Sequence, residues 1–383
     1  MTASFVAFVL AGAVLCSCSV ALAQNMPVPV PVVLGGPGAR EPQVAVSPSG
    51  AVFVAFGARD TVYCARSGDG AQTFERPVTV AAAGHLSLGM RRGPRIVVTK
   101  DAIVITAVYG RDGNGGDGDL LAWQSRDEGE SWRGPFRVND VPSAAREGLH
   151  AMVAGPNGQI VCAWLDLRGA GTQLYASTSR DNGVTWQPNR LVYRSPDKTI
   201  CECCHPSLAF DANGTLWVMW RNAVSGNRDM YVCRSQDNGR TFTPAQKLGT
   251  GTWPLDACPM DGGGLAIAPN HNPVTLWRRD NELFRCGEAQ SAETRVGRGQ
   301  QPWLASGRGG VYAVWLAGGR PGQVQVQLPG EKPRTLATVG DDPVIATAAN
   351  RYGPVVAAWS AADGVHVVPL ALPPVTGRTA SAR

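Results

Sequence analysis

One pattern recurs along this chain and constrains its fold more than any other feature. A short apolar segment, a turn that usually contains glycine, and a second apolar segment ending in an aromatic residue occur seven times. Clear copies are "HPSLAFDANGTLWVMW" and "QQPWLASGRGGVYAVW". The closing aromatic residues are Phe56, Tyr109, Trp164, Trp220, Trp277, Trp315 and Trp359. Short apolar segments joined by such turns are typical of antiparallel strands, so the pattern predicts a repeat architecture built of paired strands.

Two further strands are expected in most copies. After the aromatic residue come a loop and a third strand, as in "DTVYCARS" or "DMYVCRS", and then a fourth strand, as in "ERPVTV". Four short strands per repeat predict the blades of an all-β propeller. Seven blades are favoured because seven copies occur, and six is the alternative count if one copy is irregular. The last copy holds three obvious strands. The early segment "VPVPVVLGG" would supply the fourth and close the ring, which removes an exposed sheet edge.

Composition agrees with a turn-rich β fold. The chain has 383 residues, of which 46 are glycine and 28 are proline, and long stretches of helical periodicity are hard to find. The net charge is +5 and the basic residues are scattered, which argues against a nucleic-acid partner. After the N-terminal segment, no stretch is long and apolar enough to predict a transmembrane segment. We expect a monomer.

The N-terminal segment predicts export. Residues 1–23 are apolar and end in Ala-Leu-Ala, which is typical of a secretory signal peptide cleaved after Ala23. The segment Leu15-Cys16-Ser17-Cys18 also resembles a bacterial lipobox, in which Cys18 would be acylated. We therefore expect a periplasmic or extracellular protein, with a lipoprotein tethered through Cys18 as the alternative. Residues 24–374 would form a single propeller domain, and residues 375–383 a disordered tail.

Four copies carry a second motif between their third and fourth strands. It reads "SGDGAQTF", "SRDEGESW", "SRDNGVTW" and "SQDNGRTF". Ser and Asp side chains can bond the backbone amides of a turn, and Gly permits a positive φ, so we expect the motif to brace turns rather than to catalyse. The residues concerned are Ser67, Asp69, Ser125, Asp127, Gly129, Trp132, Ser179, Asp181, Gly183, Trp186, Ser235, Asp237, Gly239 and Phe242.

The pattern Ser-x-Asp-x-Gly-x-Thr-aromatic resembles the Asp box, or BNR repeat, of the sialidase superfamily. The resemblance implies a propeller whose functional face lies opposite the Asp boxes. It also implies an exo-α-sialidase-like glycosidase, in which three arginines bind the sialic acid carboxylate and a tyrosine is the nucleophile. Arg40 in "AREP", Arg221 in "WRN" and Arg278 in "WRR" are positioned like those arginines. No late tyrosine matches the nucleophile, since Tyr352 falls in a turn on the Asp-box face. The alternative is a non-catalytic propeller that binds an anionic glycan or another small anionic ligand.

A cysteine-rich stretch, "TICECCHPSLAF", leads into the fourth copy. A further cysteine, in "WPLDACPMDGGG", leads into the fifth copy and would lie on the same face in the neighbouring blade. Together with a later Cys-Pro, the Cys-x-Cys-Cys motif resembles that of a secreted bacterial subgroup of sialidase-like proteins. The cluster consists of Cys201, Cys203, Cys204, His205 and Cys258.

Three interpretations of this cluster stay open. In an oxidising compartment disulfides are the default, and one of the first three cysteines would then bridge to Cys258. Sulfur and imidazole ligands, with Met260 nearby, also suit a metal ion such as Cu(I) or Zn²⁺. The spacing Cys201-x-x-Cys204-His205 matches covalent haem attachment, but the extra Cys203 makes haem the weakest of the three. No cofactor is otherwise required.

Overall fold

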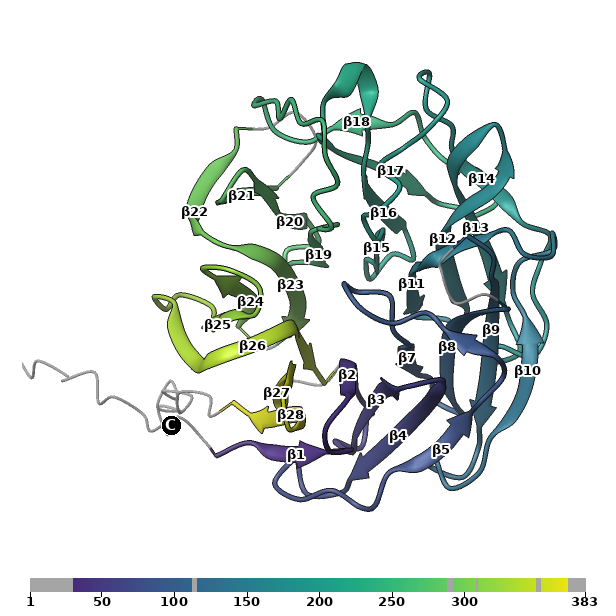
Figure 1. Cartoon of the computed structure of the whole chain (residues 1–383), viewed down its shortest axis with the longest axis vertical. Helices are drawn as coiled ribbons and strands as arrows, with labels where there is room; N and C mark the ends of the chain where they lie inside the picture. The colour runs from purple at the N-terminus through teal and green to yellow at the C-terminus, as the bar shows by residue number, and fades with distance from the viewer. Residues whose placement is uncertain (1–29, 112–115, 288–291, 308, 349–352, 371–383) are drawn as a thin grey trace, which may run out of the picture.

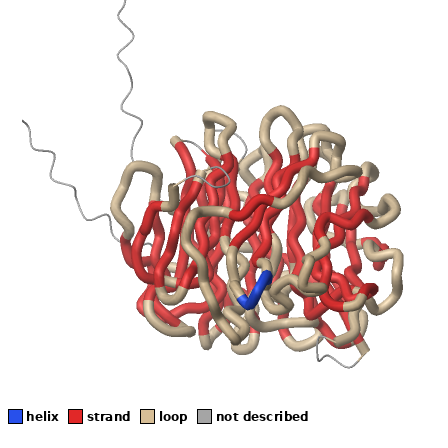
Figure 2. The backbone as a smooth tube through the Cα atoms, turned by 90° about the horizontal axis from the view of Figure 1, so that it is seen from above, coloured by secondary structure: helices blue, strands red, loops and turns tan. Residues whose placement is uncertain are grey.

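The protein is built almost entirely of β-strands arranged around a central axis. The computed structural model describes residues 30–370 except 112–115, 288–291, 308 and 349–352. Figure 1 shows the sheets following one another around a ring in chain order, and Figure 2 shows the strands side by side with loops at both ends. The prediction of an all-β fold made of four-stranded sheets is confirmed, and the arrangement is that of a propeller. The predicted signal peptide, Cys18, Tyr352 and the tail at 375–383 lie outside the described residues.

Five sheets are each made of consecutive strands. The first contains β2 (Ala39–Val46), β3 (Val52–Ala58), β4 (Thr61–Ser67) and β5 (Val78–Ala81). The second contains β6 (His85–Leu86), β7 (Arg95–Val98), β8 (Ile103–Gly110), β9 (Asp119–Ser125) and β10 (Arg133–Arg137), and both β6 and β7 pair with β8. The third contains β11 (Ala145–Ala154), β12 (Ile160–Gly169), β13 (Gly171–Ser179) and β14 (Arg190–Tyr193).

The fourth and fifth sheets continue the series. The fourth contains β15 (Ser207–Phe210), β16 (Leu216–Arg221), β17 (Met230–Ser235) and β18 (Gln246–Lys247), with the short 3₁₀ segment η1 (Val224–Gly226) in the loop after β16. The fifth contains β19 (Gly264–Ile267), β20 (Pro273–Arg279), β21 (Glu282–Cys286) and β22 (Thr294–Arg298). In these sheets the first strand of the repeat lies nearest the axis and the later strands lie progressively farther out (Figure 1).

The sixth sheet has seven strands and includes the N-terminal one. It consists of β23 (Gln300–Gly307), β24 (Gly310–Ala317), β25 (Gly322–Gln327), β26 (Arg334–Thr347), β27 (Val355–Ala361), β28 (Gly364–Pro369) and β1 (Val32–Leu34). The 14-residue strand β26 connects its two parts, because residues 334–340 pair with β25 and residues 341–347 pair with β27. Strand β1 pairs antiparallel with β28, with Val33 opposite His366, so the two ends of the described chain share one sheet.

The hydrophobic core lies between the faces of neighbouring sheets. All seven closing aromatic residues of the repeat are buried, and Trp164 and Trp220 have no exposed surface. Between the third and fourth sheets, Leu165 and Leu174 pack in one cluster with Val218 and Trp220. Because each central strand is covered on both faces, its sequence is a continuous apolar run rather than an alternating one, which explains why the repeat was visible in the sequence.

The four Asp-box turns repeat one hydrogen-bond pattern. In the third turn, Ser179 Oγ donates to Asp181 Oδ1 (2.8 Å) and accepts from Gly183 N (2.8 Å). Asp181 also accepts from Thr185 N (2.9 Å) and Thr185 Oγ1 (2.6 Å), while Trp186 Nε1 donates to Gly183 O (3.1 Å). The same serine–aspartate bond joins Ser67 to Asp69, Ser125 to Asp127 and Ser235 to Asp237. These aspartates are held inside turns by local bonds.

Candidate functional site

Backbone bulges at the inner strands of the ring bring polar side chains toward the axis. The pairing register shifts at Glu41 in β2, at Gln301 in β23 and at Asp342 in β26. These three residues have φ angles of 56°, 54° and 48°, and all three are buried. A positive φ is rare for residues with a Cβ, so the same unusual backbone at three equivalent places is a repeated structural device. Together with Asp261, these residues form what we call the polar ring.

Two links of the polar ring run through the fifth and sixth sheets. Asp261 Oδ2, in the loop before β19, accepts the backbone amide of Gln301 at 2.6 Å. Gln301 Oε1 in turn accepts the backbone amide of Asp342 at 3.2 Å. Each acceptor therefore satisfies the amide of the next bulge around the axis, which fixes the relative position of neighbouring repeats.

A further set of bonds holds Glu41 between the second sheet and the last strands of the described chain. The carboxylate of Glu41 accepts the amides of Arg92 (3.1 Å) and Gly93 (2.7 Å) in the second sheet. The amide of Glu41 donates to Ser360 Oγ in β27 at 2.8 Å. Glu41 thus bonds both to the sheet that follows it and to the last part of the described chain.

Two buried arginines lie against the polar ring. Arg91 and Arg95 both stack on Trp303, with guanidinium-to-ring distances of 5.1 and 5.9 Å. Arg91 Nη2 donates to Gln301 O (2.7 Å), and Arg95 Nη2 donates to Arg91 O (2.6 Å). Four other buried nitrogens have no hydrogen-bond partner among the described residues: Arg91 Nε and Nη1, Arg95 Nε, and Gln301 Nε2. Arg91 Nε lies 4.0 Å from Asp342 Oδ1, beyond hydrogen-bonding distance.

A small cavity lies between the inner strands, beside Arg95 and Trp303. Its volume is about 150 Å³, and its polar lining comes from Gln43, Arg95 and Ser207, with Trp303 and apolar side chains of the inner strands completing it. The volume corresponds to about five water molecules. It would hold a carboxylate group with some water, but not a whole sugar ring with its substituents.

Asp342 is a buried carboxyl group whose pKa is raised. Burial is the main cause, the nearby carboxylate of Glu41 acts in the same direction and the charge of Arg320 opposes both, so that the pKa lies at about 7. Arg320 Nη2 donates to Asp342 Oδ1 at 3.0 Å. Asp342 can therefore gain or lose its proton close to neutral pH, a property concentrated at functional sites.

The structure gives Arg221 a scaffold position. Its side chain is 1% exposed. Its three nitrogens donate to the backbone carbonyls of Asp261 (2.8 Å), Arg228 (2.6 Å) and Arg278 (3.0 Å). Because each nitrogen already donates to a backbone carbonyl, Arg221 has no pair of adjacent N–H groups available for a ligand carboxylate.

The other two arginines of the predicted carboxylate clamp, Arg278 and Arg40, lie in different sheets. Arg278 is half-buried, donates to Gln300 Oε1 at 3.2 Å, and shares the ring of Trp253 with Arg221. Arg40 is exposed at the start of β2, in a different sheet. The structure therefore brings Arg221 and Arg278 together and leaves Arg40 separate. The arginines that it does gather at the axis are Arg91 and Arg95.

Three cysteines of the predicted cluster converge below the same face. Cys201 Sγ lies 3.0 Å from Cys204 Sγ and 3.7 Å from Cys203 Sγ, and the three sulfur atoms all lie within 4.8 Å of one another. All three are buried, with Met260 packed against them. Cys258 is exposed and contacts the thiol of Cys203. No disulfide joins any two cysteines of the described chain, so the predicted bridge to Cys258 is not formed in this structure.

His205 stands apart from the three thiols. Its Nε2 donates to Gly263 O at 3.2 Å, and its ring stacks on Trp303 with 5.8 Å between centroids. Burial lowers its pKa well below the usual value, and the charges of Arg91 and Arg95 act in the same direction. The imidazole is therefore neutral and enclosed by protein. This position does not suit an axial ligand of haem.

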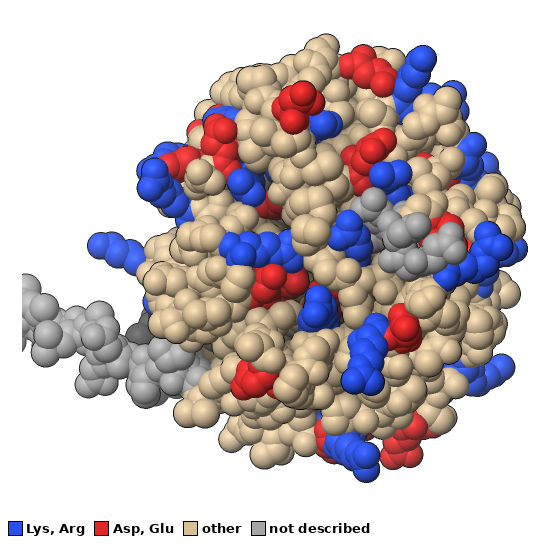
Figure 3. Space-filling view, viewed as in Figure 1, with Lys and Arg blue, Asp and Glu red and all other residues tan. Residues whose placement is uncertain are grey.

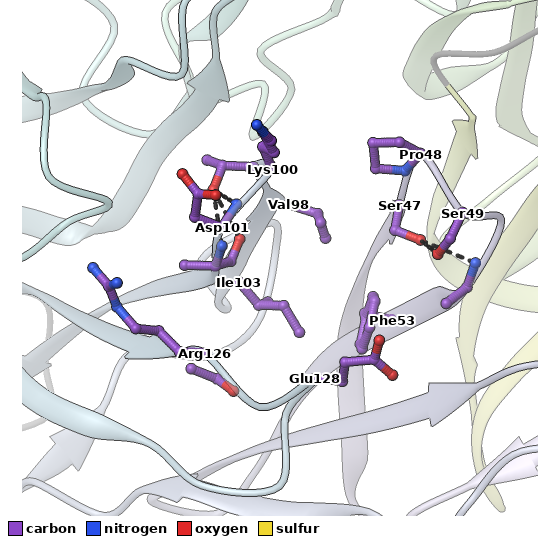
Figure 4. A pocket seen from close by; sticks show the side chains of 14 residues that line it. Ser47, Pro48, Ser49, Phe53, Val98, Lys100, Asp101, Ile103, Arg126 and Glu128 are labelled. Carbon is purple, nitrogen blue, oxygen red and sulfur yellow. Dashed lines mark hydrogen bonds between the residues drawn. The ribbon is translucent and has the colours of Figure 1, made fainter.

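A larger pocket lies at the other end of the ring, beside the second Asp box (Figure 4). Its volume is about 360 Å³, with Phe53, Val98 and Ile103 among its apolar lining. Several of its polar side chains are engaged locally: Ser47 Oγ bonds Ser49 Oγ at 2.7 Å, and Glu128 bonds Arg66 at 2.5 Å. Because local partners satisfy these groups, we place the functional site at the polar ring instead.

Sequence reasoning missed most of the residues at the axis. Glu41, Asp342, Arg95 and Trp303 were not among the predicted site residues. The sequence does contain a signal for this region. In five repeats a proline stands at the start of the first strand, and the residue before it or directly after it lies at or near the axis. These dipeptides are Glu41-Pro42, Gly93-Pro94, His205-Pro206, Gln301-Pro302 and Asp342-Pro343.

Radial four-stranded sheets with Asp-box turns define a BNR-type β-propeller of the sialidase-like class. The model of the BNR repeat-like domain matches residues 57–281, more than half of the chain, so the chain belongs to that family. No curated protein sequence matches it. No described helix is long and apolar enough to cross a membrane. The face seen in Figure 3 carries basic and acidic side chains close together, without a broad area of one charge.

Solved structures of carbohydrate-active enzymes share this fold. An α-L-arabinanase of Penicillium chrysogenum in complex with arabinobiose is 12% identical, with 89% of this chain and 97% of that chain aligned and a TM-score of 0.54. An ulvan lyase of polysaccharide lyase family 25 is 10% identical over 89% and 96% of the chains, with a TM-score of 0.57. A Hadza microbial sialidase is 14% identical over 88% of this chain and 66% of its own, with a TM-score of 0.50. At these identities the likeness concerns the fold.

Proposed function

We propose that this protein is an exported, seven-bladed propeller that binds an anionic glycan at the end of the ring opposite the Asp boxes. The blade count is supported by β26, whose two parts pair with different strands, so that the seven-stranded sheet divides into two blades. The pairing of β1 with β28 then supplies the last strand. Export is supported by the apolar segment at residues 1–23.

The unpartnered donors at the axis are the observation that carries the choice of ligand. Arg91, Arg95 and Gln301 are buried, and each has at least one nitrogen without an acceptor among the described residues. A buried donor without an acceptor costs about 1–3 kcal/mol, so an acceptor-rich group at this place is favoured. A carboxylate suits guanidinium groups best, because its two oxygens match their planar donors. A sugar acid could place its carboxylate at the axis while its ring contacts the loops around it.

Asp342 gives the binding a predicted pH dependence. Its pKa is raised to about 7, so it is neutral below that pH and negatively charged above it. A neutral Asp342 would not repel a carboxylate bound to Arg91, which lies beside it. We expect affinity for sugar acids to rise as the pH falls from about 8 to about 6.

The binding test compares acidic and neutral sugars. The purified mature protein is titrated calorimetrically with N-acetylneuraminate and with glucuronate-containing oligosaccharides, and arabino-oligosaccharides serve as neutral ligands. The variant Gln301→Glu keeps the side-chain shape but replaces the donor with a carboxylate, and we expect at least tenfold weaker binding of acidic sugars. The matched control is Arg234→Met, which removes an exposed arginine that contacts only the ring of Trp217 through its guanidinium. Equal affinity for acidic and neutral sugars, or an unaffected Gln301→Glu variant, would contradict the proposal.

The hydrolytic form of the proposal has a separate test. Release of the fluorophore from a fluorogenic sialoside is measured for the parent protein and for Gln301→Glu. Turnover that is lost in Gln301→Glu supports an exo-α-sialidase-like enzyme. Binding of acidic sugars without turnover of any sialoside supports the non-catalytic propeller instead.

A further inference from the structure

The three thiols of Cys201, Cys203 and Cys204 have the spacing of ligands around one ion. Their sulfur atoms are separated by 3.0 Å and 3.7 Å along two edges, and all lie within 4.8 Å of one another. Two thiolates bound to the same ion at about 2.3 Å lie about 3.8 Å apart in a tetrahedral arrangement. A disulfide would require about 2.05 Å. The 3.7 Å separation of Cys201 and Cys203 matches a shared ion, and the 3.0 Å separation of Cys201 and Cys204 is about 1 Å longer than a disulfide bond.

The surroundings of the thiols are rich in sulfur and poor in oxygen and nitrogen ligands. The thioether residue Met260 packs against the cysteine cluster and is held at a positive φ of 54°. His205 is directed to Gly263 O, as described above. Glu202 is engaged by the hydroxyls of Thr199 (3.1 Å) and Thr172 (3.4 Å). Ligand sets made only of thiolate and thioether select soft ions such as Cu(I) or Zn²⁺.

The number of thiols distinguishes between these ions. The group whose ligand atoms lie within 4.8 Å of one another contains three cysteines and does not include Cys258. A structural Zn²⁺ site needs four ligands in a tetrahedron, whereas three sulfurs around one ion fall short of that number. The geometry therefore favours Cu(I).

Arg221 supplies an independent observation. It is buried, and all three of its nitrogens meet carbonyl oxygens, so among the described residues it has no carboxylate within salt-bridge distance. Its backbone oxygen accepts the amide of Cys201 at 3.1 Å, which places the backbone of the arginine beside the first cysteine of the cluster. A buried charge without a counter-charge is costly. Three thiolates around a monovalent ion carry a net double negative charge, and that charge would compensate Arg221.

We propose that Cys201, Cys203 and Cys204 bind one Cu(I) ion, and that Cys258 and Met260 form the route by which the ion reaches them. On binding, three S–H groups release three protons and three Cu–S bonds form, with no change in oxidation state. Cys258 is the only described cysteine that is exposed, and its thiol contacts that of Cys203, so it is placed to capture an ion at the surface. The three inner thiols then exclude water from the bound ion.

The test titrates Cu(I) into the reduced, mature protein under anaerobic conditions, with the chromogenic chelator bathocuproine disulfonate as competitor. We expect one equivalent to be withheld from the chelator. Cys204→Ser should weaken binding at least 100-fold, and Cys258→Ser should slow loading while changing affinity less than tenfold. The matched control is Cys64→Ala, which removes a buried thiol in β4 outside the cluster and should leave binding unchanged. X-ray absorption of the loaded protein should show three sulfur neighbours. The circular dichroism spectrum of each variant is compared with that of the parent protein, so that weaker Cu(I) binding by a folded variant is distinguished from unfolding.

Three results would overturn the proposal. The first is a disulfide between any two of the cluster cysteines, found by mass spectrometry in protein purified from the exported fraction without reductant. The second is stoichiometric Zn²⁺ that depends on Cys258 as a fourth ligand and is not displaced by Cu(I). The third is Cu(I) binding that survives in Cys204→Ser. None of these measurements involves a sugar, so the outcome is independent of the proposed glycan ligand.

Discussion

The two ends of the propeller use the same backbone repeat in opposite ways. At one end, four Asp-box turns carry nearly the same residues and make the same hydrogen bonds. At the other end, equivalent bulges of the inner strands share a positive φ but carry different side chains. These residues are Glu41, Gly148, Gln301 and Asp342. The difference teaches that side chains repeated from blade to blade, as in the Asp boxes, stabilise the turns. Where the backbone conformation repeats but the side chains differ, as at the bulges, the chemistry can differ from blade to blade.

The two ends also differ in how their carboxyl groups respond to acid. Hydrogen bonds from the hydroxyls of Thr73 and Ser131 lower the pKa of Asp69 and Asp127 to about 2. Burial raises the pKa of Asp342 to about 7. The Asp boxes therefore stabilise the fold above their unfolded-state pKa and lose that contribution as the pH falls toward 2. Ionisation of Asp342 destabilises the fold as the pH rises toward 7.

The largest expected effect belongs to the polar end. Arg221→Met removes three hydrogen bonds to buried carbonyls, and we expect the free energy of unfolding to fall by at least about 3 kcal/mol. Urea denaturation followed by tryptophan fluorescence measures the change. The exposed Arg234→Met should change stability by less than about 0.5 kcal/mol. A similar loss of unfolding free energy in both variants would show that the buried hydrogen bonds of Arg221 are not the cause of the destabilisation.

A smaller effect is expected from the titration of Asp342. Its folded-state pKa is above the unfolded value of 3.8, so the folded state binds the extra proton between the two values. The free energy of unfolding should then rise by up to about 2 kcal/mol as the pH falls from about 7 to about 5. Asp342→Asn cannot titrate and should lose this slope. Measuring both proteins across that pH range isolates the contribution, and parallel pH profiles would argue against it.

The Asp-box end should respond more weakly to a single substitution. Asp181→Ala removes the acceptor of bonds from Ser179 and Thr185 within one turn, and we expect a loss of about 1 kcal/mol, as for a helix N-cap. Binding of Cu(I) and of acidic sugars should stay unchanged, because the turn lies at the opposite end of the ring. If ligand binding fell while the fold was retained, the division of roles between the two ends would be wrong.

The smallest effect is expected where one Asp box departs from its pattern. Ala71 has a φ of 73° at the position where the other boxes have Gly129, Gly183 and Gly239. Ala71→Gly relieves this backbone strain but removes a buried methyl group, so we expect a change within about 1 kcal/mol in the stabilising direction. The reverse change, Gly183→Ala, should destabilise, because its Cβ would lie 2.8 Å from Val104 Cγ1. Thermal unfolding of the two variants gives the comparison.

Part of the candidate site was accessible from the sequence. The proximity of Cys201, Cys203 and Cys204 followed from their separation in the sequence. The choice of the end opposite the Asp boxes came from the resemblance to sialidases and stays a prediction. The role of Arg221 did not, because its acceptors are carbonyls of Arg228, Asp261 and Arg278 on other loops, which no side-chain pattern reveals. The bridge to Cys258 was expected from the compartment, whereas no disulfide joins the described cysteines.

The sequence by itself determined the all-β repeat and the Asp-box turns, because both depend on contacts made within a few residues. Ser179, Asp181 and Thr185 bond one another inside a single turn, so their identities are enough to specify it. Only the tertiary structure decided the polar ring and its buried arginines. Glu41 bonds Ser360 across 319 residues and Arg91 bonds Gln301 across 210. Closure of the ring brings such residues together, and neither composition nor local periodicity encodes which of them will meet at the axis.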